Sequence, residues 1–212
     1  LNQFHIIHAH NVHVSTMLIF ACIFSKYKYL KKTIFTIHNS YENYSFKHLI
    51  QLPFIFLFMN KIVFCSNSSK KSFPFVFRLL SKGKGITICN GVDYDSIFKV
   101  KRSLKKNIKN HFTLIFLGRL IEKKNPMILL KAFQELDLLN SKLIFVGDGP
   151  LRKKIENEAN NKVLFRRNIP REKVYHLLCE SDLFISMSET EGLPIATLEA
   201  LSAGLPVILS KI

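Results

Sequence analysis

The second half of the chain alternates short apolar runs with amphipathic stretches, and this alternation constrains the fold more than any other feature. Apolar runs at 112–118, 142–147, 163–165, 183–187 and 207–209 predict buried strands. The stretches between them, at 126–139, 151–159, 171–179 and 194–203, predict helices. Strict alternation of this kind predicts an α/β fold with a parallel sheet covered by helices on both faces. Ligands of such sheets bind beyond the carboxyl ends of the strands.

The first half shows the same kind of pattern less regularly. Predicted strands are at 4–8, 33–37, 62–65 and 86–89, and predicted helices are at 12–24, 46–59 and 69–80, the last two interrupted by Pro53 and Pro74. The polar, lysine-rich segment 93–111 is interpreted as a linker. The sequence therefore predicts an N-terminal lobe at 1–92, a linker at 93–111 and a C-terminal lobe at 112–212.

Positive charge is concentrated in the first half of the 212 residues. The net charge is +16, but residues 1–110 carry 17 Lys and Arg against 3 Asp and Glu, whereas residues 111–212 carry 14 against 12. This asymmetry predicts an anionic partner, which is a membrane surface, a phosphorylated lipid or a nucleic acid. The alternative interpretation is a genomic bias toward lysine, with solvated faces and no partner.

The most apolar stretch, 49–59, is too short to span a bilayer and is interrupted by Gln51 and Pro53. A buried helix is the default interpretation. The alternative is an interfacial helix flanked by Lys47 and Lys61.

Cysteine and histidine spacings give little support for a metal centre. The four cysteines have no C-x-x-C spacing, which argues against a metal cluster or a disulfide framework and fits a reducing cytoplasm. His8 and His10 would share one face of a strand, but nothing nearby supplies a carboxylate or thiolate. His38 directly follows the predicted strand 33–37 and is placed for polar contact or proton handling, or is simply a satisfied histidine at the sheet edge.

Two glutamates, Glu191 and Glu199, stand eight positions apart around a predicted turn and helix start. Glu191 lies in the turn, where it could hold sugar hydroxyls, and free N–H groups at the helix start would attract an anion. Glu199 lies in the helix and could accept both hydrogens of a vicinal diol such as a ribose. The alternative is that Glu199 is solvated and Glu191 only caps the helix.

Further polar residues follow the strands of the second half. Arg119, directly after Gly118, and Lys124 form a pair of cations that suits a diphosphate, although pairing with acids such as Glu122 is the alternative. The turn from Gly147 to Gly149 resembles a nucleotide-binding turn but lacks the third glycine of G-x-G-x-x-G.

Taken in order, these motifs resemble the retaining glycosyltransferases of family 4, which carry an E-x7-E signature and have the two-lobed GT-B fold. The motifs are Ile37-His38, Asn90-Gly91-Val92-Asp93, Gly118-Arg119-Leu120 with Lys124-Asn125-Pro126, Val146-Gly147-Asp148-Gly149-Pro150-Leu151, and the segment from Glu191 to Glu199. The resemblance covers most of the chain and implies two Rossmann-like lobes.

The resemblance also implies roles for these residues. Arg119 and Lys124 would hold the donor diphosphate, Glu199 the nucleotide ribose, and Glu191 the donor sugar, while His38 would lie beside the reacting centre on the acceptor side. The implied catalytic residues are therefore His38, Glu191, Arg119 and Lys124. The implied donor-binding residues are Gly118, Arg119, Lys124, Gly147, Gly149, Glu191, Gly192, Leu193, Pro194 and Glu199.

The implied reaction transfers a sugar from a nucleotide-sugar, with retention and without a metal or other cofactor. The expected acceptor is a lipid-linked or cell-surface glycan of polysaccharide or lipopolysaccharide assembly. The expected location is the cytoplasm, peripheral on the inner face of the plasma membrane, with an anionic membrane surface and no nucleic acid as partner.

The chain departs from the family pattern in three respects. It begins with Leu1 and lacks the family's initial strands and their glycine-rich loop, and it stops at Ile212, before the family's closing helices. Both lobes are therefore expected to be incomplete at these ends. Arg167 stands where a glycine is usual. The alternative function is that of an inactive, truncated glycosyltransferase remnant. A basic nucleic-acid-binding protein is a further, less favoured alternative.

Overall fold

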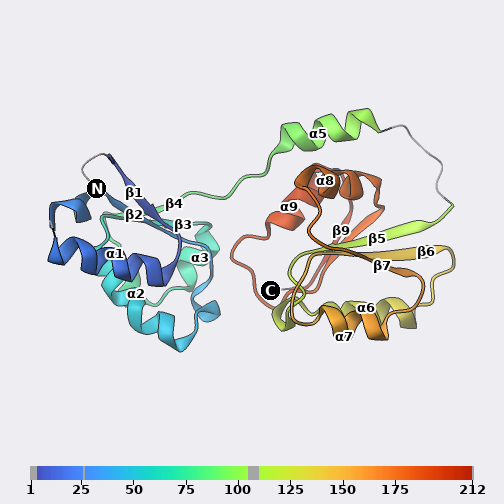
Figure 1. The fold of residues 1–212 in the computed structure, drawn as a ribbon, viewed down its shortest axis with the longest axis horizontal. Helices are drawn as coiled ribbons and strands as arrows, with labels where there is room; N and C mark the ends of the chain where they lie inside the picture. The colour runs from blue at the N-terminus through green and yellow to red at the C-terminus, as the bar shows by residue number, and fades with distance from the viewer. Residues whose placement is uncertain (1–3, 26, 105–109, 212) are drawn as a thin grey trace. The chain divides into compact units, whose positions relative to one another are not determined.

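The computed structural model describes residues 4–25, 27–104 and 110–211. The chain folds into two compact units (Figure 1). Unit 1 comprises Leu1–Asn90 together with Glu191–Leu193, and unit 2 comprises Gly91–Thr190 together with Pro194–Ile212. Each unit contains its own parallel sheet, in agreement with the predicted α/β class.

Unit 1 is built on a four-stranded parallel sheet with the order β1-β2-β3-β4. The strands are β1 (Ile7–Ala9), β2 (Thr33–Ile37), β3 (Lys61–Phe64) and β4 (Gly85–Thr87). The helices are α1 (Val12–Phe24), α2 (Phe46–Phe58), α3 (Asn67–Ser72) and α4 (Phe75–Leu80), with short 3-10 turns η1 (Tyr27–Lys32) and η2 (Tyr41–Asn43).

The predicted interruption of the helix 69–80 by Pro74 is confirmed, because the structure divides this stretch into α3 and α4. Pro74 has no N–H to donate and disfavours helical backbone in the residue before it. Phe73 is accordingly extended, with φ −74° and ψ 136°, and Pro74 becomes the cap of α4. The predicted interruption by Pro53 is wrong, because Pro53 lies inside the continuous helix α2.

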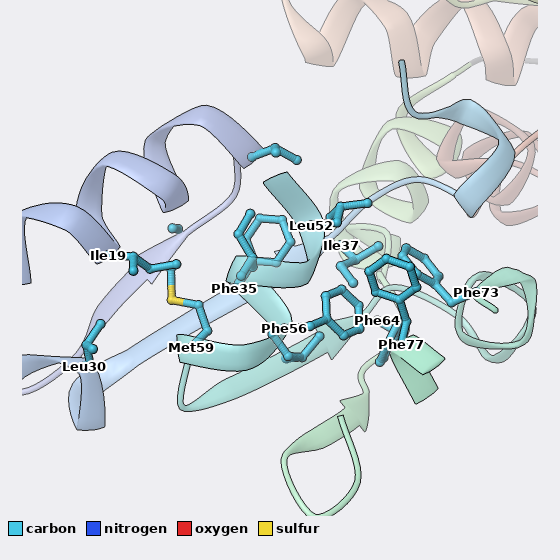
Figure 2. Packing of buried hydrophobic residues seen from close by; sticks show 14 of the residues in the cluster. Ile19, Leu30, Phe35, Ile37, Leu52, Phe56, Met59, Phe64, Phe73 and Phe77 are labelled. Atoms are coloured by element: carbon cyan, nitrogen blue, oxygen red, sulfur yellow. The ribbon is translucent and has the colours of Figure 1, made fainter. Parts of the chain in front are cut away.

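The core of unit 1 is rich in phenylalanine (Figure 2). Phe56 from α2, Phe64 from β3, Phe73 and Phe77 are all buried. The ring centroids of Phe56 and Phe77 lie 5.0 Å apart in an edge-to-face arrangement, and Phe73 packs against Phe64 at 5.7 Å. Such pairs add to the stabilisation from burial alone, so this cluster anchors α2 and α4 to the sheet.

Unit 2 is built on a five-stranded parallel sheet with the order β7-β6-β5-β8-β9. Its strands are β5 (Phe112–Leu117), β6 (Ser141–Val146), β7 (Val163–Arg166), β8 (Leu183–Ser186) and β9 (Val207–Leu209). Its helices are α5 (Tyr94–Ser103), α6 (Pro126–Glu135), α7 (Arg152–Glu158), α8 (Arg171–Glu180) and α9 (Ile195–Ser202), with the 3-10 turn η3 (Glu122–Lys124). Within unit 2, α6 and α7 cover one face of the sheet, and α5, α8 and α9 cover the other (Figure 1).

The predicted linker 93–111 differs from the structure, because most of it forms α5. Asp93 Oδ1 accepts a hydrogen bond from Ser96 N at 3.1 Å and so caps the helix. Ile97 and Val100 are buried with side chains of α8 and α9, and Lys101 Nζ donates to Ala203 O at 2.8 Å. Positions 105–109 lie outside the described residues.

Helix length also bears on the membrane question. Among the described residues, no helix combines the length and the apolar character needed to cross a bilayer.

Candidate functional site

The site in unit 2 is formed where β5, β6 and β8 end at the same edge of the sheet. The loop after β5 is bound to the loop after β6, since Leu120 N donates to Asp148 O at 2.9 Å and Leu151 N donates back to Leu120 O at 3.1 Å. Gly118 N donates to Val146 O at 3.0 Å and continues the ladder of the two strands. Gly118 and the Gly147–Gly149 turn are therefore brought together, as the strand-end argument predicts.

The same β5 loop is also bound to the segment after β8. Glu189 N donates to Lys123 O at 2.9 Å. Asn125, which has a left-handed φ of 48°, donates from Nδ2 to Met187 O at 3.1 Å and to Glu189 Oε1 at 3.2 Å. Hydrogen bonds thus connect three loops along this edge, which we call the unit 2 rim: residues 118–125, 147–151 and 187–189.

At two positions of the rim, only glycine fits, because the neighbouring main chain leaves no room for a Cβ atom. A Cβ on Gly147 would lie inside 3.0 Å of Gly118 O, and one on Gly149 would lie inside 3.0 Å of Leu120 O. Gly147 also has a φ of +143°, which side-chain-bearing residues rarely adopt. Gly118 differs, because its Cβ would meet the Phe116 ring at an ordinary 3.5 Å.

Both predicted cations lie on the rim. Arg119 is exposed and directly follows Gly118, and Lys124 is half-buried at the end of η3. The fold therefore places two positive charges on the loop that the other two loops hold in position. Opposite charge, such as that of a diphosphate, would be stabilised there.

Glu199 lies in α9 and is buried, and sequence reasoning missed its partner. Arg171, the first residue of α8, donates from Nη2 to Glu199 Oε1 and from Nε to the Tyr175 hydroxyl at 2.7 Å. The hydrogen bond to Tyr175 and then the Glu199 carboxylate raise the pKa of the Arg171 guanidinium. The i, i+4 spacing of Arg171 and Tyr175 indicates their contact, but nothing local links either residue to Glu199.

Arg167, noted as a departure from the family pattern, makes a second contact that was not predicted. Its Nε lies 2.7 Å from Asp148 Oδ2, while Asp148 Oδ1 accepts from Gly149 N at 2.9 Å. This ion pair ties the segment after β7 to the rim. Both side chains are partly exposed, so we assign it little stability.

In unit 1, His38 lies at the end of β2 within a group of histidines. His10 Nδ1 and His38 Nε2 are 3.0 Å apart, and His8 Nε2 lies 2.7 Å from Thr36 Oγ1. Both His8 and His38 keep exposed surface. Partial desolvation, followed by the nearby His10 and His8, lowers the pKa of His38. Partial desolvation and His10 likewise lower the pKa of His8. Among the described residues, no group of three or more His, Cys, Asp and Glu is arranged to hold a metal ion.

The tripeptide Glu191–Leu193 belongs to unit 1. Ser40 Oγ donates to Glu191 O at 3.2 Å, and Ser66 Oγ donates to Gly192 O at 2.9 Å. A Cβ on Gly192 would lie inside 3.0 Å of His38 O. The two glutamates therefore fall in different units, Glu191 in unit 1 and Glu199 in unit 2, where Pro194 precedes α9.

Comparison with known proteins identifies the family. The model of the family described as "Glycosyl transferases group 1" matches residues 98–212, which is more than half of the chain. The chain belongs to this family.

Curated relatives of this family member include an uncharacterized glycosyltransferase of Methanocaldococcus jannaschii, which is 27% identical over 93% of the chain and 52% of the relative. The "UDP-Gal:alpha-D-GlcNAc-diphosphoundecaprenol alpha-1,3-galactosyltransferase" of Escherichia coli is 33% identical over 59% of the chain and 36% of the relative. The chain thus spans about half of the length of the first of these relatives, and less of the second.

Solved structures support the fold. HepE of Anabaena, in complex with UDP and glucose, superposes with a TM-score of 0.77 at 20% identity, over 98% of this chain and 59% of that one. Sucrose-phosphate synthase of Thermosynechococcus elongatus gives a TM-score of 0.76 at 17% identity, over 99% and 56% of the two chains. These likenesses confirm the predicted GT-B type of α/β fold.

The histidine group gives a pH prediction for this member of the family. Because the pKa values of His8 and His38 lie below the ordinary 6.5, unfolding increases their affinity for protons. Their contribution to stability is present above pH 6.5 and is lost as the pH falls through the lowered values. We expect the free energy of unfolding, from urea titrations followed by circular dichroism, to decrease below pH 6.5.

The double variant His8→Asn/His38→Asn should show a smaller decrease over the same interval. His5, which is exposed like His8 and His38, lies outside the contacts that join His8, His10 and His38, and His5→Asn is the control for the loss of a histidine as such. An equal slope in the wild type and in the double variant would contradict this assignment.

Proposed function

We propose that this group 1 glycosyl transferase transfers a sugar, with retention at the anomeric carbon, from a nucleoside-diphosphate sugar to an acceptor hydroxyl, as in family 4. One observation carries the proposal. The unit 2 rim holds Arg119 and Lys124 on a loop that hydrogen bonds fix to the loops after β6 and β8. A pair of cations on a loop that is held at the carboxyl edge of a parallel sheet suits a diphosphate.

In the proposed reaction, these two cations stabilise the leaving group, which is the nucleoside diphosphate. Cleavage of the bond between the sugar and the phosphate leaves negative charge on the diphosphate, and preorganised positive charge lowers the energy of that state. We assign this role to Arg119 and Lys124 and propose that no metal ion or other cofactor takes part. Glu199 would accept hydrogen bonds from the ribose hydroxyls.

On the acceptor side, we assign proton handling to His38. Its lowered pKa keeps the imidazole neutral near pH 7, and a neutral ring nitrogen can accept a hydrogen bond from an acceptor hydroxyl. Glu191 and the adjacent Gly192, Leu193 and Pro194 would bind the donor sugar. In the family 4 mechanism, the departing phosphate itself helps to remove the acceptor proton.

We further propose that the acceptor is a lipid-linked or cell-surface glycan of polysaccharide or lipopolysaccharide assembly, at the cytoplasmic face of an anionic membrane. The name of the E. coli relative includes a diphosphoundecaprenol-linked sugar, which supports a lipid-linked acceptor. The strongly basic first half of the chain supports the proposal that the protein acts at an anionic membrane surface.

Titration with UDP tests the donor assignment. In buffer with EDTA, we expect Arg119→Ala and Lys124→Ala each to weaken UDP binding by about 10- to 100-fold, the range for a lost charge-assisted hydrogen bond. Isothermal titration calorimetry measures the change. Lys142, at the amino end of β6 and so at the opposite edge of the sheet, is the control, and Lys142→Ala should bind UDP like the wild type. Unchanged affinity in both rim variants would remove the assignment.

A further inference from the structure

Helix α1 of unit 1 is uncharged and mostly apolar around its circumference, apart from the exposed His13, the half-buried Thr16 and the buried Ser15. Its thirteen residues include no Asp, Glu, Lys or Arg. Val12, Ser15, Ile19 and Cys22 face the sheet and are buried, and Ile19 packs in the core shown in Figure 2. Yet the opposite side of the helix, which is also apolar, is exposed. A helix with apolar residues all around is normally buried in protein or in lipid.

Helix α2 repeats this arrangement. Leu52, Ile55 and Phe56 point inward and are buried, and the outward side is apolar apart from Lys47. The two helices are neighbours, since Thr16 Oγ1 donates to Gln51 Oε1 at 3.2 Å, and the His13 and His48 rings lie 4.8 Å apart.

Together the outward sides make a surface that we call the α1–α2 face. It consists of the exposed side chains of Val14, Met17, Phe20, Phe24, Phe46, Ile50, Phe54 and Leu57. Exposed apolar patches that extend over neighbouring elements mark interaction sites rather than ordinary surface. Four of these eight residues are phenylalanines, which bury the largest areas when they are covered.

The charge around this face indicates what covers it. Residues 1–90 contain eleven Lys and Arg and a single acidic residue, Glu42. Lys47 is exposed in the first turn of α2, and the exposed Lys61 follows shortly after the end of that helix. An apolar face accompanied by cations complements the headgroups and acyl boundary of an anionic bilayer. A second copy of the chain would bring the same positive charge and be repelled.

We propose that the α1–α2 face is the surface by which this protein docks on an anionic lipid bilayer. The inference rests on the membrane partner of the proposed function and names the residues that would enter the lipid. Each helix has thirteen residues and is about 20 Å long, which is short of the roughly 30 Å hydrocarbon core. The helices therefore lie in the plane of the interface, with their phenylalanines below the headgroups.

Vesicle sedimentation tests this docking surface with the full chain. Probes are vesicles of phosphatidylcholine alone and of phosphatidylcholine with phosphatidylglycerol at a ratio of about 3:1, the second supplying the anionic charge. Binding to the anionic vesicles should exceed binding to the neutral ones and should decrease with salt. Phe24→Glu, and more strongly Phe24→Glu/Phe54→Glu, should weaken it by about tenfold or more, because apolar area is lost and like charge is introduced.

A matched control comes from unit 2. Leu139 is 88% exposed and Phe24 is 85% exposed, so Leu139→Glu makes a similar change on a surface outside the proposed contact and should bind vesicles like the wild type. Circular dichroism and thermal melts establish that the variants fold, which is expected because the changed side chains are exposed.

Several results would overturn the proposal. They are no preference for anionic vesicles, equal binding in the double variant and the wild type, or a change of oligomeric state on sedimentation velocity in the double variant without loss of lipid binding. The UDP titration is run on the same samples. Loss of vesicle binding with intact UDP binding supports the docking surface, whereas absent UDP binding with intact vesicle binding overturns the donor assignment alone.

Discussion

Gly149→Ala should destabilise unit 2 by about 3 kcal/mol, the upper part of the range for overpacking, and should abolish measurable UDP binding. The physical reason is a clash between two main chains. The added Cβ would lie inside 3.0 Å of Leu120 O, and that carbonyl already accepts the hydrogen bond from Leu151 N. Neither side can move by a rotamer change, so the β5 and β6 loops must separate. Arg119 lies next to Leu120 and would be displaced with it.

Gly147→Ala should act in the same direction, since its Cβ would meet Gly118 O and its φ of +143° disfavours any side chain. Thermal unfolding followed by circular dichroism measures the loss of stability, and calorimetry with UDP measures the loss of binding. The control is Gly118→Ala in the same rim, where the nearest atoms are 3.5 Å away in the Phe116 ring. It should change stability by less than about 0.5 kcal/mol. Equal destabilisation by all three substitutions would show that the rim does not depend on this close approach.

The rim was predictable because it depends on periodicity and chain order. Apolar runs that end at Gly118 and Gly147 predict strand ends, and parallel strands bring their carboxyl ends to one edge. The strands 33–37 and 207–209 and the helix 12–24 were predicted with the bounds that the structure has. The roles assigned to Arg119, Lys124, Glu191, Glu199 and His38 stay predictions, because they concern ligands.

Prediction from the sequence was wrong where a lysine-rich composition obscured the apolar spacing of a helix. The segment 93–111 was interpreted as a linker because lysines dominate it, but Ile97, Val100 and Leu104 recur at helical spacing and belong to the core of unit 2. Similarly, an apolar pattern predicted α1 without indicating that one side of this helix is exposed, and for α2 exposure was only the alternative interpretation, as an interfacial helix. Which side of an apolar helix lacks cover depends on the neighbouring elements, and these are known only from the fold.

Tertiary ion pairs were the second kind of failure. Arg171 and Glu199 are 28 positions apart on two helices, and no local spacing joins them. Glu199 was interpreted as facing either a ribose or solvent, whereas its carboxylate is buried and receives a hydrogen bond from Arg171. If Glu199 binds a ribose, the Glu199 carboxylate either accepts hydrogen bonds from both Arg171 and the ligand, or exchanges its bond with Arg171 for bonds with the ligand.

This pair gives a second prediction of large effect, which follows from its asymmetry. The Glu199 side chain is 7% exposed and that of Arg171 is 65% exposed. Arg171→Ala removes the cationic partner of a buried carboxylate, and only water that enters the vacated space can replace it. We expect the free energy of unfolding to decrease by about 2–3 kcal/mol. This is less than the cost of breaking an ion pair in which both partners are buried, because the Arg171 side chain is exposed to solvent. Glu199→Gln should cost less, since the freed guanidinium can be hydrated.

A double-mutant cycle separates this effect from simple loss of packing. Arg171→Ala/Glu199→Gln should be more stable than Arg171→Ala alone, because the second change removes the buried charge that the first left unpaired. Arg171→Lys tests geometry, since lysine lacks the planar fork that reaches Glu199 and Tyr175 together. Urea unfolding of the wild type, the two single variants Arg171→Ala and Glu199→Gln, and the double variant gives the coupling energy. Additive effects, or a double variant less stable than Arg171→Ala, would mean that Glu199 does not depend on Arg171 for its burial.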